Sequence, residues 1–298
     1  MMRAYTAAGA GLTGQLTEIT VPLPIPGEHE VLIESYAISV HPGIGQTRSG
    51  IAGVVAAAGS GVGRFKPGDA VFGLMSAEEG GTYTEYMLAS GHELALKPEG
   101  LSFEAAGILP AAGLAAWQAL AWAQVSGRDR VLIHDGTGGT GSFAVQLAKL
   151  RGATVITTIS GNGLDLAWEL GADQAICSGE QDFTAILGRS IDVVIDTGGG
   201  AALDRSFAVL APGGKLVSTA GTPDPRKAAQ QGVNAAYIVP AADPFQLTEL
   251  ARLAAGRRLK PLIGGIFPFS ADGLRGAQDY SESRQMHGIH VIQFKSQE

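Results

Sequence analysis

Val131-Leu132-Ile133-His134 is an apolar run that leads almost directly into Gly136-Thr137-Gly138-Gly139-Thr140-Gly141. After the glycines, Phe143, Leu147 and Leu150 recur at the spacing of one helix face. The stretch therefore predicts a strand, a tight turn and a helix. Its glycines follow the pattern G-x-G-x-x-G, in which one glycine allows the turn, a second lets the backbone approach a pyrophosphate, and a third lets the helix pack on the strand.

Backbone N–H groups at the start of such a helix hold phosphates, so we predict that Gly136 to Gly141 bind a dinucleotide. The alternative is a packing turn without a ligand. An NAD site has Asp or Glu at the end of the second strand, about 20 residues further on. This chain has Thr157-Thr158-Ile159-Ser160 there, and its next acid is Asp165. The hydroxyls of Thr158 and Ser160 could instead contact a 2′-phosphate. We therefore expect the protein to prefer NADPH over NADH as its cofactor.

The surrounding chain changes character along its length. The first hundred residues contain short apolar runs punctuated by Gly and Pro, which predicts an all-β domain. From about residue 103, strand-like and helix-like segments alternate, as they do around a parallel sheet. Residues 261–294 return to β-like segments and are too few to fold alone. We therefore divide the chain into residues 1–113, 114–258 and 259–298, with the last segment rejoining the first domain.

Composition excludes several classes of function. The only cysteine in the 298 residues is Cys177, so neither an intrachain disulfide nor a cysteine-built zinc site is possible. The net charge of −7, without any basic run, argues against nucleic acid as a partner. The N-terminus lacks the apolar core of a signal peptide, and the uncharged stretch from Ala105 to Gly127 is mostly Ala and contains Pro110. We expect a buried helix there, no membrane partner and a cytoplasmic protein.

With these residues in view, the chain resembles the zinc-free medium-chain dehydrogenase/reductase proteins, and among them the quinone oxidoreductase branch that includes zeta-crystallin. The matching stretches are Ile51–Val55 with Phe65–Val71, Gly81–Tyr86, Gly136–Lys149, Leu170–Asp173, Asp192–Gly199 and Leu210–Val217. The resemblance implies an α/β fold with a GroES-like β domain (1–113 and 259–298) and a Rossmann doubly wound parallel-sheet domain (114–258). It also implies a homodimer, a cleft between the domains for nicotinamide and a small-molecule substrate, and no catalytic metal.

The chain departs from this family where the nicotinamide side of the cleft is expected. A family loop that commonly carries Asn, Asp and Tyr has His41, Ile44 and Gln46 in their places. Histidine is a proton donor near neutral pH, so His41 is a candidate for catalysis. Gln46 is a candidate for binding a substrate oxygen. The alternatives are that His41 only forms hydrogen bonds in the pocket wall or loop, and that Gln46 is a solvated loop residue.

Further departures affect the same wall. Gly50 runs directly into Ile51, where relatives have an intervening segment, and Ala115 replaces a common Thr. Three functions therefore compete. The first is an NADPH-dependent reductase of a quinone or a conjugated C=C bond, because few catalytic side chains are required when the cofactor carries the chemistry. The others are a non-redox cyclase, lyase or isomerase on the same fold, and a binding protein that senses NADPH.

Overall fold

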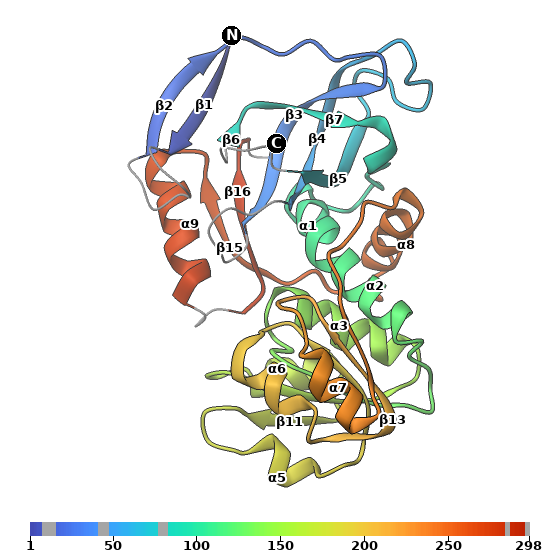
Figure 1. The fold of residues 1–298 in the computed structure, drawn as a ribbon. Helices are drawn as coiled ribbons and strands as arrows, with labels where there is room; N and C mark the ends of the chain where they lie inside the picture. Colours follow the sequence, from blue (N-terminus) through green and yellow to red (C-terminus); the bar gives the residue numbers. More distant parts are fainter. Residues whose placement is uncertain (8–15, 41–47, 77–82, 284–286, 296–298) are drawn as a thin grey trace. The chain divides into compact units, whose positions relative to one another are not determined.

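The computed structural model describes residues 1–7, 16–40, 48–76, 83–283 and 287–295, and its elements divide into two units (Figure 1). Unit 1 comprises residues 1–114 and 241–298, and unit 2 comprises residues 115–240. The first boundary differs by one residue from our expectation. The second falls before helix α8 (Pro244–Ala255), where we expected it at residue 258. The reason is packing, since the side chain of Leu250 on α8 lies against Gly113 of unit 1.

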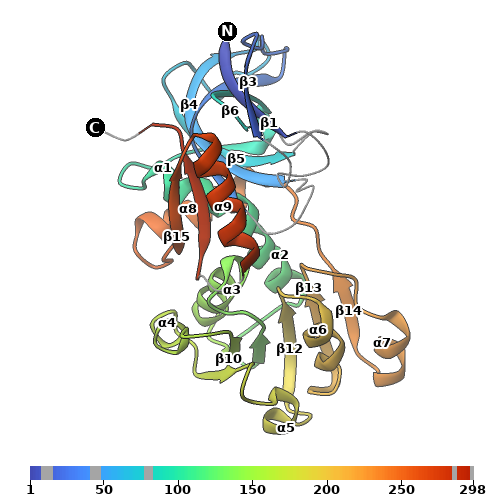
Figure 2. The same cartoon turned by 90° about the vertical axis from the view of Figure 1, so that its left-hand side faces the viewer.

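Unit 2 is built on one six-stranded sheet in the order β11-β10-β9-β12-β13-β14, and every pair is parallel (Figure 2). The strands are β9 (Arg130–Ile133), β10 (Thr154–Ile159), β11 (Gln174–Cys177), β12 (Ile191–Asp196), β13 (Leu210–Ser218) and β14 (Asn234–Tyr237). The central strands are mostly apolar and buried, as in Val131–Ile133 of β9 and Val193–Ile195 of β12. This is the composition of a sheet that is covered on both faces. The strand order starts at the middle and extends first one way and then the other, as in a doubly wound fold.

Helices connect these parallel strands. They are α3 (Gly139–Leu150), α4 (Leu164–Glu169), α5 (Phe183–Leu187), α6 (Gly200–Ser206) and α7 (Pro225–Gln231). One sheet face carries a core that includes Leu132, Ile156 and Val194 together with Phe183 of α5 and Leu203 of α6. Alternate residues of the same strands point to the opposite face, so a strand with both faces buried needs apolar residues throughout.

Unit 1 contains two sheets. A three-stranded sheet has the order β2-β1-β6, and a larger sheet has the order β15-β16-β3-β4-β5-β8, with β7 also paired to β3. The strands are β1 (Met2–Ala7), β2 (Leu16–Val21), β3 (Glu30–Val40), β4 (Arg48–Ala58), β5 (Ala70–Ser76), β6 (Tyr83–Thr84), β7 (Tyr86–Ser90), β8 (Leu94–Leu96), β15 (Ile263–Pro268) and β16 (Ile289–Gln293). A one-turn 3₁₀ helix spans Gly91–Glu93. The C-terminal segment thus rejoins the first domain through β16, which pairs with β3.

We expected only β-like segments in residues 261–294, but the structure also has a helix there. Helix α9 (Ala271–Ser283) lies between β15 and β16 and packs on both strands (Figure 1). Leu274 and Ala277 of α9 are buried in a cluster with Tyr5 and Ile292. These two residues are three positions apart, which is a helical spacing rather than the alternation of a strand.

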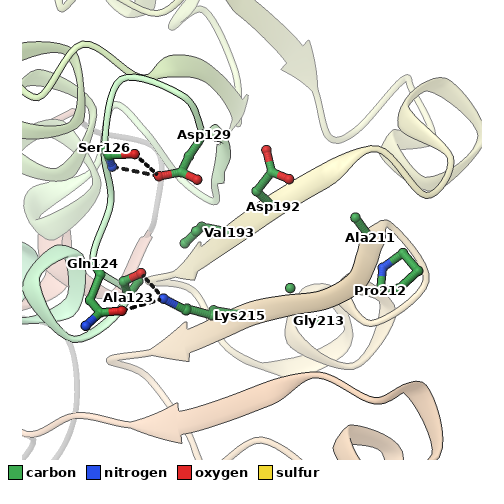
Figure 3. A pocket seen from close by; sticks show the side chains of 11 residues that line it. Ala123, Gln124, Ser126, Asp129, Asp192, Val193, Ala211, Pro212, Gly213 and Lys215 are labelled. Carbon is green, nitrogen blue, oxygen red and sulfur yellow. Dashed lines mark hydrogen bonds between the residues drawn. The ribbon is translucent and has the colours of Figure 1, made fainter.

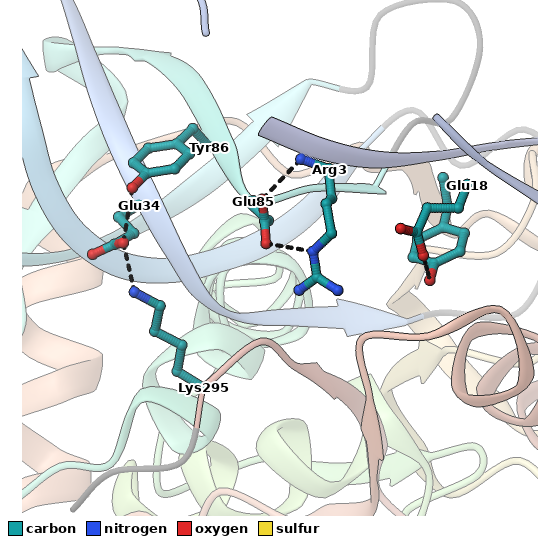
Figure 4. A network of polar contacts seen from close by, with 7 residues as sticks. Arg3, Glu18, Glu34, Glu85, Tyr86 and Lys295 are labelled. Carbon is teal, nitrogen blue, oxygen red and sulfur yellow. Dashed lines mark hydrogen bonds and ion pairs between the residues drawn. The ribbon is translucent and has the colours of Figure 1, made fainter. Parts of the chain in front are cut away.

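A set of polar contacts joins segments of unit 1 that lie far apart in the sequence (Figure 4). Glu34 on β3 accepts hydrogen bonds from the hydroxyl of Tyr86 at 2.9 Å and from the ammonium of Lys295 at 2.6 Å. Arg3 on β1 donates its backbone N–H and its Nε to Glu85, both at 2.8 Å. Such partly exposed ion pairs contribute about 0–1 kcal/mol each, so the apolar clusters rather than these pairs hold the sheets together.

One long helical stretch connects the two units. It consists of α1 (Phe103–Ile108), a π-helical turn over Leu109–Gly113, and α2 (Leu114–Trp122). Ser102 caps its start by accepting the N–H of Ala105. Within the described residues, this is the helix whose length and composition would suffice to cross a membrane, but 72% of the apolar window is buried inside the protein. The expectation of a buried helix is confirmed.

Glycine at position 50 is required by a close approach of this helix to β4. A Cβ on Gly50 would lie 2.1 Å from the carbonyl oxygen of Gly107 and 2.9 Å from Cδ of Pro110. We expect Gly50→Ala to lower the free energy of unfolding of unit 1 by about 1–3 kcal/mol, because the backbone must move to admit the methyl group. Differential scanning calorimetry measures the effect.

The matched control for that substitution is Gly63→Ala. No heavy atom lies within 4 Å of a Cβ built on Gly63, so the control should melt at or slightly above the wild-type temperature. Equal melting temperatures for Gly50→Ala and the wild type would contradict the packing described here.

Candidate functional site

The candidate site lies at the carboxyl end of β9, in the middle of the sheet of unit 2. β9 has β10 on one side and β12 on the other. The chain passes from β9 through α3 to β10 and later returns to β12, so the connections after β9 and β12 leave the sheet in opposite directions. Open α/β sheets bind their ligands at such a switch point, outside the carboxyl ends of the strands.

Two glycines of the predicted motif make backbone contacts that no other residue would permit. A Cβ on Gly136 would lie 1.9 Å from Oγ1 of Thr157 on β10, and a Cβ on Gly141 would lie 2.0 Å from the carbonyl oxygen of Asp135. The first lets the turn lie on the neighbouring strand. The second lets α3 begin directly against the turn. These are two of the roles that the sequence pattern assigns to its glycines.

Helix α3 begins with Gly138 as its N-cap, a residue that has no side chain of its own to form a capping hydrogen bond. The first hydrogen bond of the helix runs from the N–H of Ser142 to the carbonyl of Gly138 at 3.0 Å. The N–H groups of Gly139, Thr140 and Gly141 therefore precede the intrahelical ladder at the positive end of a twelve-residue helix. This arrangement favours an anion such as a phosphate. We call residues 135–141 the cradle.

His134, the residue directly before the cradle, links the cradle to β10 and α6 through hydrogen bonds. Its ring is buried, with Nδ1 3.0 Å from Oγ1 of Thr158 on β10 and Nε2 2.8 Å from Oγ of Ser206 on α6. Ser206 donates its own hydroxyl proton to the carbonyl of Ala202 at 2.7 Å. Ser206 Oγ is therefore the acceptor for Nε2–H, and Nδ1 accepts from Thr158. Thr158 Oγ1 in turn accepts the N–H of Asp135 at 3.3 Å, which links the imidazole to the first residue of the cradle.

The imidazole is therefore held in its neutral form. Burial lowers the pKa of His134 to about 4, because a charged ring would lose its hydration without gaining an equivalent partner. The neutral tautomer satisfies both ring nitrogens and the hydroxyls beside them. This histidine is structural, because its hydrogen bonds join β10 and α6 to the turn after β9.

A second buried group orders the neighbouring loops. Asp196, fully buried at the end of β12, accepts the N–H of Gly199 at 3.0 Å and the hydroxyl of Ser218 at 2.6 Å. The same Ser218 oxygen accepts the N–H groups of Ala220 and Gly221, each at 3.1 Å. The carboxylate thereby fixes the chain after β12 and after β13, at the same edge of the sheet as the cradle.

The structure distinguishes among the residues that we predicted to bind the cofactor. Gly136, Gly138, Gly139, Thr140 and Gly141 come together in the cradle, whereas the side chain of Thr137 is buried. Thr158 was predicted to face a 2′-phosphate, but its hydroxyl is buried between His134 and Asp135. Because both faces of a parallel sheet are covered, a threonine within the strand points into the protein. Ser160, just beyond the strand, is exposed.

Other predicted positions fall elsewhere. His41, Ile44 and Gln46 lie outside the described residues, and Ala115 is buried on α2. Among the described residues there is no group of three or more His, Cys, Asp or Glu placed to hold a metal. Sequence reasoning missed Asp135, whose φ of 54° lies in the left-handed region. The available signal was an acid directly before the glycine motif.

A polar cavity of about 280 Å³ lies at the opposite, amino-terminal edge of the same sheet (Figure 3). Asp129, Asp192 and Lys215 line it. Lys215 donates to the carbonyl of Ala123 at 2.7 Å, and Asp129 accepts from Ser126 at 2.7 Å. These groups terminate α2 and shape the turn before β9, so the cavity has a structural explanation and is separate from the cradle.

Comparison with known proteins agrees with the fold and the motif. A family model described as zinc-binding dehydrogenase matches residues 139–242. The chain is 31% identical to 2-methylene-furan-3-one reductase of Solanum lycopersicum, over 98% of this chain and 79% of the relative. It is 30% identical to the chloroplastic NADPH-dependent alkenal/one oxidoreductase of Arabidopsis thaliana, over 92% of this chain and 75% of the relative.

A solved structure gives the same result. The quinone oxidoreductase from Coxiella burnetii superimposes with a TM-score of 0.89 at 30% identity, covering 99% of each chain. The chain therefore belongs to the medium-chain dehydrogenase/reductase family, in its quinone-oxidoreductase-like branch, and is an oxidoreductase. The resemblance and the fold class inferred from the sequence, a GroES-like domain with a Rossmann domain, are confirmed.

The neutral His134 predicts a specific dependence of stability on pH. Its folded-state pKa of about 4 lies below the ordinary value of 6.5, so the unfolded state binds a proton first as the pH falls. The free energy of unfolding should therefore drop through the window from pH 6.5 to 4, by about 3 kcal/mol. We expect His134→Gln to have a lower free energy of unfolding than the wild type at pH 7. Because the variant has no imidazole at this position, its free energy of unfolding should not show the drop of about 3 kcal/mol between pH 6.5 and pH 4.

Urea unfolding of unit 2 at several pH values, for the wild type and the variant, measures the difference between the two curves. Titrations elsewhere in the protein are common to both curves and cancel. Parallel curves between pH 7 and pH 4 would show that His134 does not titrate as described.

Proposed function

We propose that this protein is a zinc-independent, NADPH-dependent reductase that transfers a hydride to a quinone or to a C=C bond conjugated to a carbonyl. The observation that carries the proposal is the cradle, which presents the start of α3 at the switch point of a doubly wound sheet. The names of the relatives from Solanum lycopersicum, Arabidopsis thaliana and Coxiella burnetii support the substrate class.

The end of β10 supports NADPH over NADH. No Asp or Glu stands at its end to bind the ribose hydroxyls, and the exposed residues after Ile159 begin with Ser160. The hydroxyl of Ser160 suits a 2′-phosphate as a hydrogen-bond donor, although the next Lys or Arg in the sequence is as far away as Arg189. The name of the Arabidopsis thaliana relative, which includes NADPH dependence, points the same way.

The dinucleotide fits the residues that are present. Gly136 and Gly141 allow the turn and the start of α3 to come together, and the N–H groups of Gly139, Thr140 and Gly141 would hold the pyrophosphate. NADPH, when bound, supplies the hydride. The chain itself must hold the cofactor, exclude water and deliver a proton to the reduced substrate. We assign the proton to His41 and the binding of a substrate oxygen to Gln46, on the basis of residue type and the family resemblance.

Two further features are proposed. The resemblance implies a homodimer, and a solution mass of two chains by light scattering tests it. Zinc independence is supported by the donor set, since the chain has a single cysteine, Cys177, at the end of β11. A structural zinc lobe needs several cysteine ligands.

The cradle predicts how a methyl group at Gly138 would act. The three atoms nearest to a Cβ on Gly138 all belong to the carboxyl group of Asp135, at 2.1–3.1 Å, and a side-chain end can move. Gly138→Ala should therefore fold while losing roughly tenfold or more in NADPH affinity, because the methyl group fills space that the pyrophosphate needs. Isothermal titration calorimetry with NADPH and NADH measures this, with Gly63→Ala as the control. Undiminished NADPH affinity in Gly138→Ala would place the cofactor elsewhere.

The reaction predicts an effect of His41. In a panel of quinones and enones, the wild type should oxidise NADPH, and His41→Ala should lower kcat roughly tenfold or more while the Kd for NADPH stays unchanged. His92→Ala, at an exposed histidine, is the matched control. Tight NADPH binding without turnover would contradict the reductase and favour a sensor. Product formation without NADPH consumption would favour a cyclase, lyase or isomerase.

A further inference from the structure

Asp135 occupies an unusual backbone position at the entrance of the cradle. Its φ of 54° lies in the left-handed region, which is unfavourable for most residues and which Asp and Asn tolerate better than others. Its N–H donates to Thr158 Oγ1, and its carbonyl accepts the N–H of Gly138 at 3.0 Å. The backbone of Asp135 is thus fixed at both ends of a tight turn, and this determines where its side chain can go.

The side chain turns back over the cradle. Oδ2, Cγ and Oδ1 of Asp135 would lie 2.1, 2.7 and 3.1 Å from a Cβ placed on Gly138. Gly138 is the second glycine of the motif, whose missing side chain is what lets the backbone approach a pyrophosphate. The carboxyl group of Asp135 therefore fills the space that the motif keeps open for the cofactor.

The chemistry of this contact resembles that of the ligand. A carboxylate is stabilised at the positive end of a helix in the same way as a phosphate. However, the carboxylate and the pyrophosphate are both negative, and two like charges this close to each other repel. Both groups cannot be near Gly138 together without this repulsion.

We propose that Asp135 is an internal competitor of the cofactor pyrophosphate, which lowers the affinity of the cradle for dinucleotides until its carboxylate is displaced. The inference rests on the proposed function, because it requires that the cradle binds a dinucleotide. It goes further by assigning to one side chain the control of cofactor affinity. In this account the cradle binds its ligand by exchange of one anion for another.

Calorimetric titration of the intact protein with NADPH tests the proposal. Asp135→Asn removes the charge and keeps a residue that tolerates the left-handed backbone, so NADPH should bind about tenfold more tightly or better. Asp135→Gly also removes the side chain and should show the same gain. Asp129→Asn, at the other end of β9, is the matched control for loss of one negative charge and should bind NADPH like the wild type.

A second ligand separates the local effect from a general change of charge. Adenosine 2′-monophosphate lacks the pyrophosphate, so its affinity should be the same in the wild type and in Asp135→Asn. An equal gain for both ligands would overturn the competition at the cradle. Unchanged or weaker NADPH binding in both Asp135 variants, with wild-type binding intact, would overturn the inference and leave the proposed function standing. Failure of the wild type and of all variants to bind NADPH or NADH would overturn both.

Discussion

The close contact between the turn after β9 and the start of α3 constrains everything around the candidate site. Gly141 rests against the carbonyl of Asp135, and Gly136 rests against Thr157, at separations that leave no room for a Cβ. These contacts place the first N–H groups of α3 at the carboxyl edge of the sheet. The sheet order then puts this edge at the switch point, so that the start of α3 and the loops after β12 and β13 follow neighbouring strands.

Buried polar groups with hydrogen-bond partners hold this geometry. His134 stays neutral because both of its ring nitrogens have partners that suit one tautomer, and it links β10, α6 and the cradle. The carboxyl oxygens of Asp196 accept hydrogen bonds from Gly199 and Ser218. Fully satisfied networks of this kind rigidify a site, because breaking one bond leaves a buried group unpaired.

Much of the fold could be predicted from the sequence, because it depends on patterns of local residues. The apolar runs of β9, β10 and β12 and the glycines after β9 predicted a parallel sheet and a dinucleotide motif. The domain boundary at Pro240 and the inward direction of Thr158 depend on packing between segments far apart in the chain, which no local pattern records. Helix α9 was missed because its short buried stripe, with Leu274 and Ala277, lies among polar residues. The left-handed backbone of Asp135 is a property of the folded turn, and the sequence shows only an acid beside glycine.

A crystal structure of the protein in complex with NADPH tests the account most directly, because it shows the pyrophosphate and Asp135 together. The account predicts the pyrophosphate within hydrogen-bonding distance of the N–H groups of Gly139, Thr140 and Gly141, with the carboxylate of Asp135 turned away from Gly138. NADPH bound away from the start of α3 would contradict the assignment of the cradle. A pyrophosphate in the cradle beside an unmoved Asp135 carboxylate would contradict the exchange of anions.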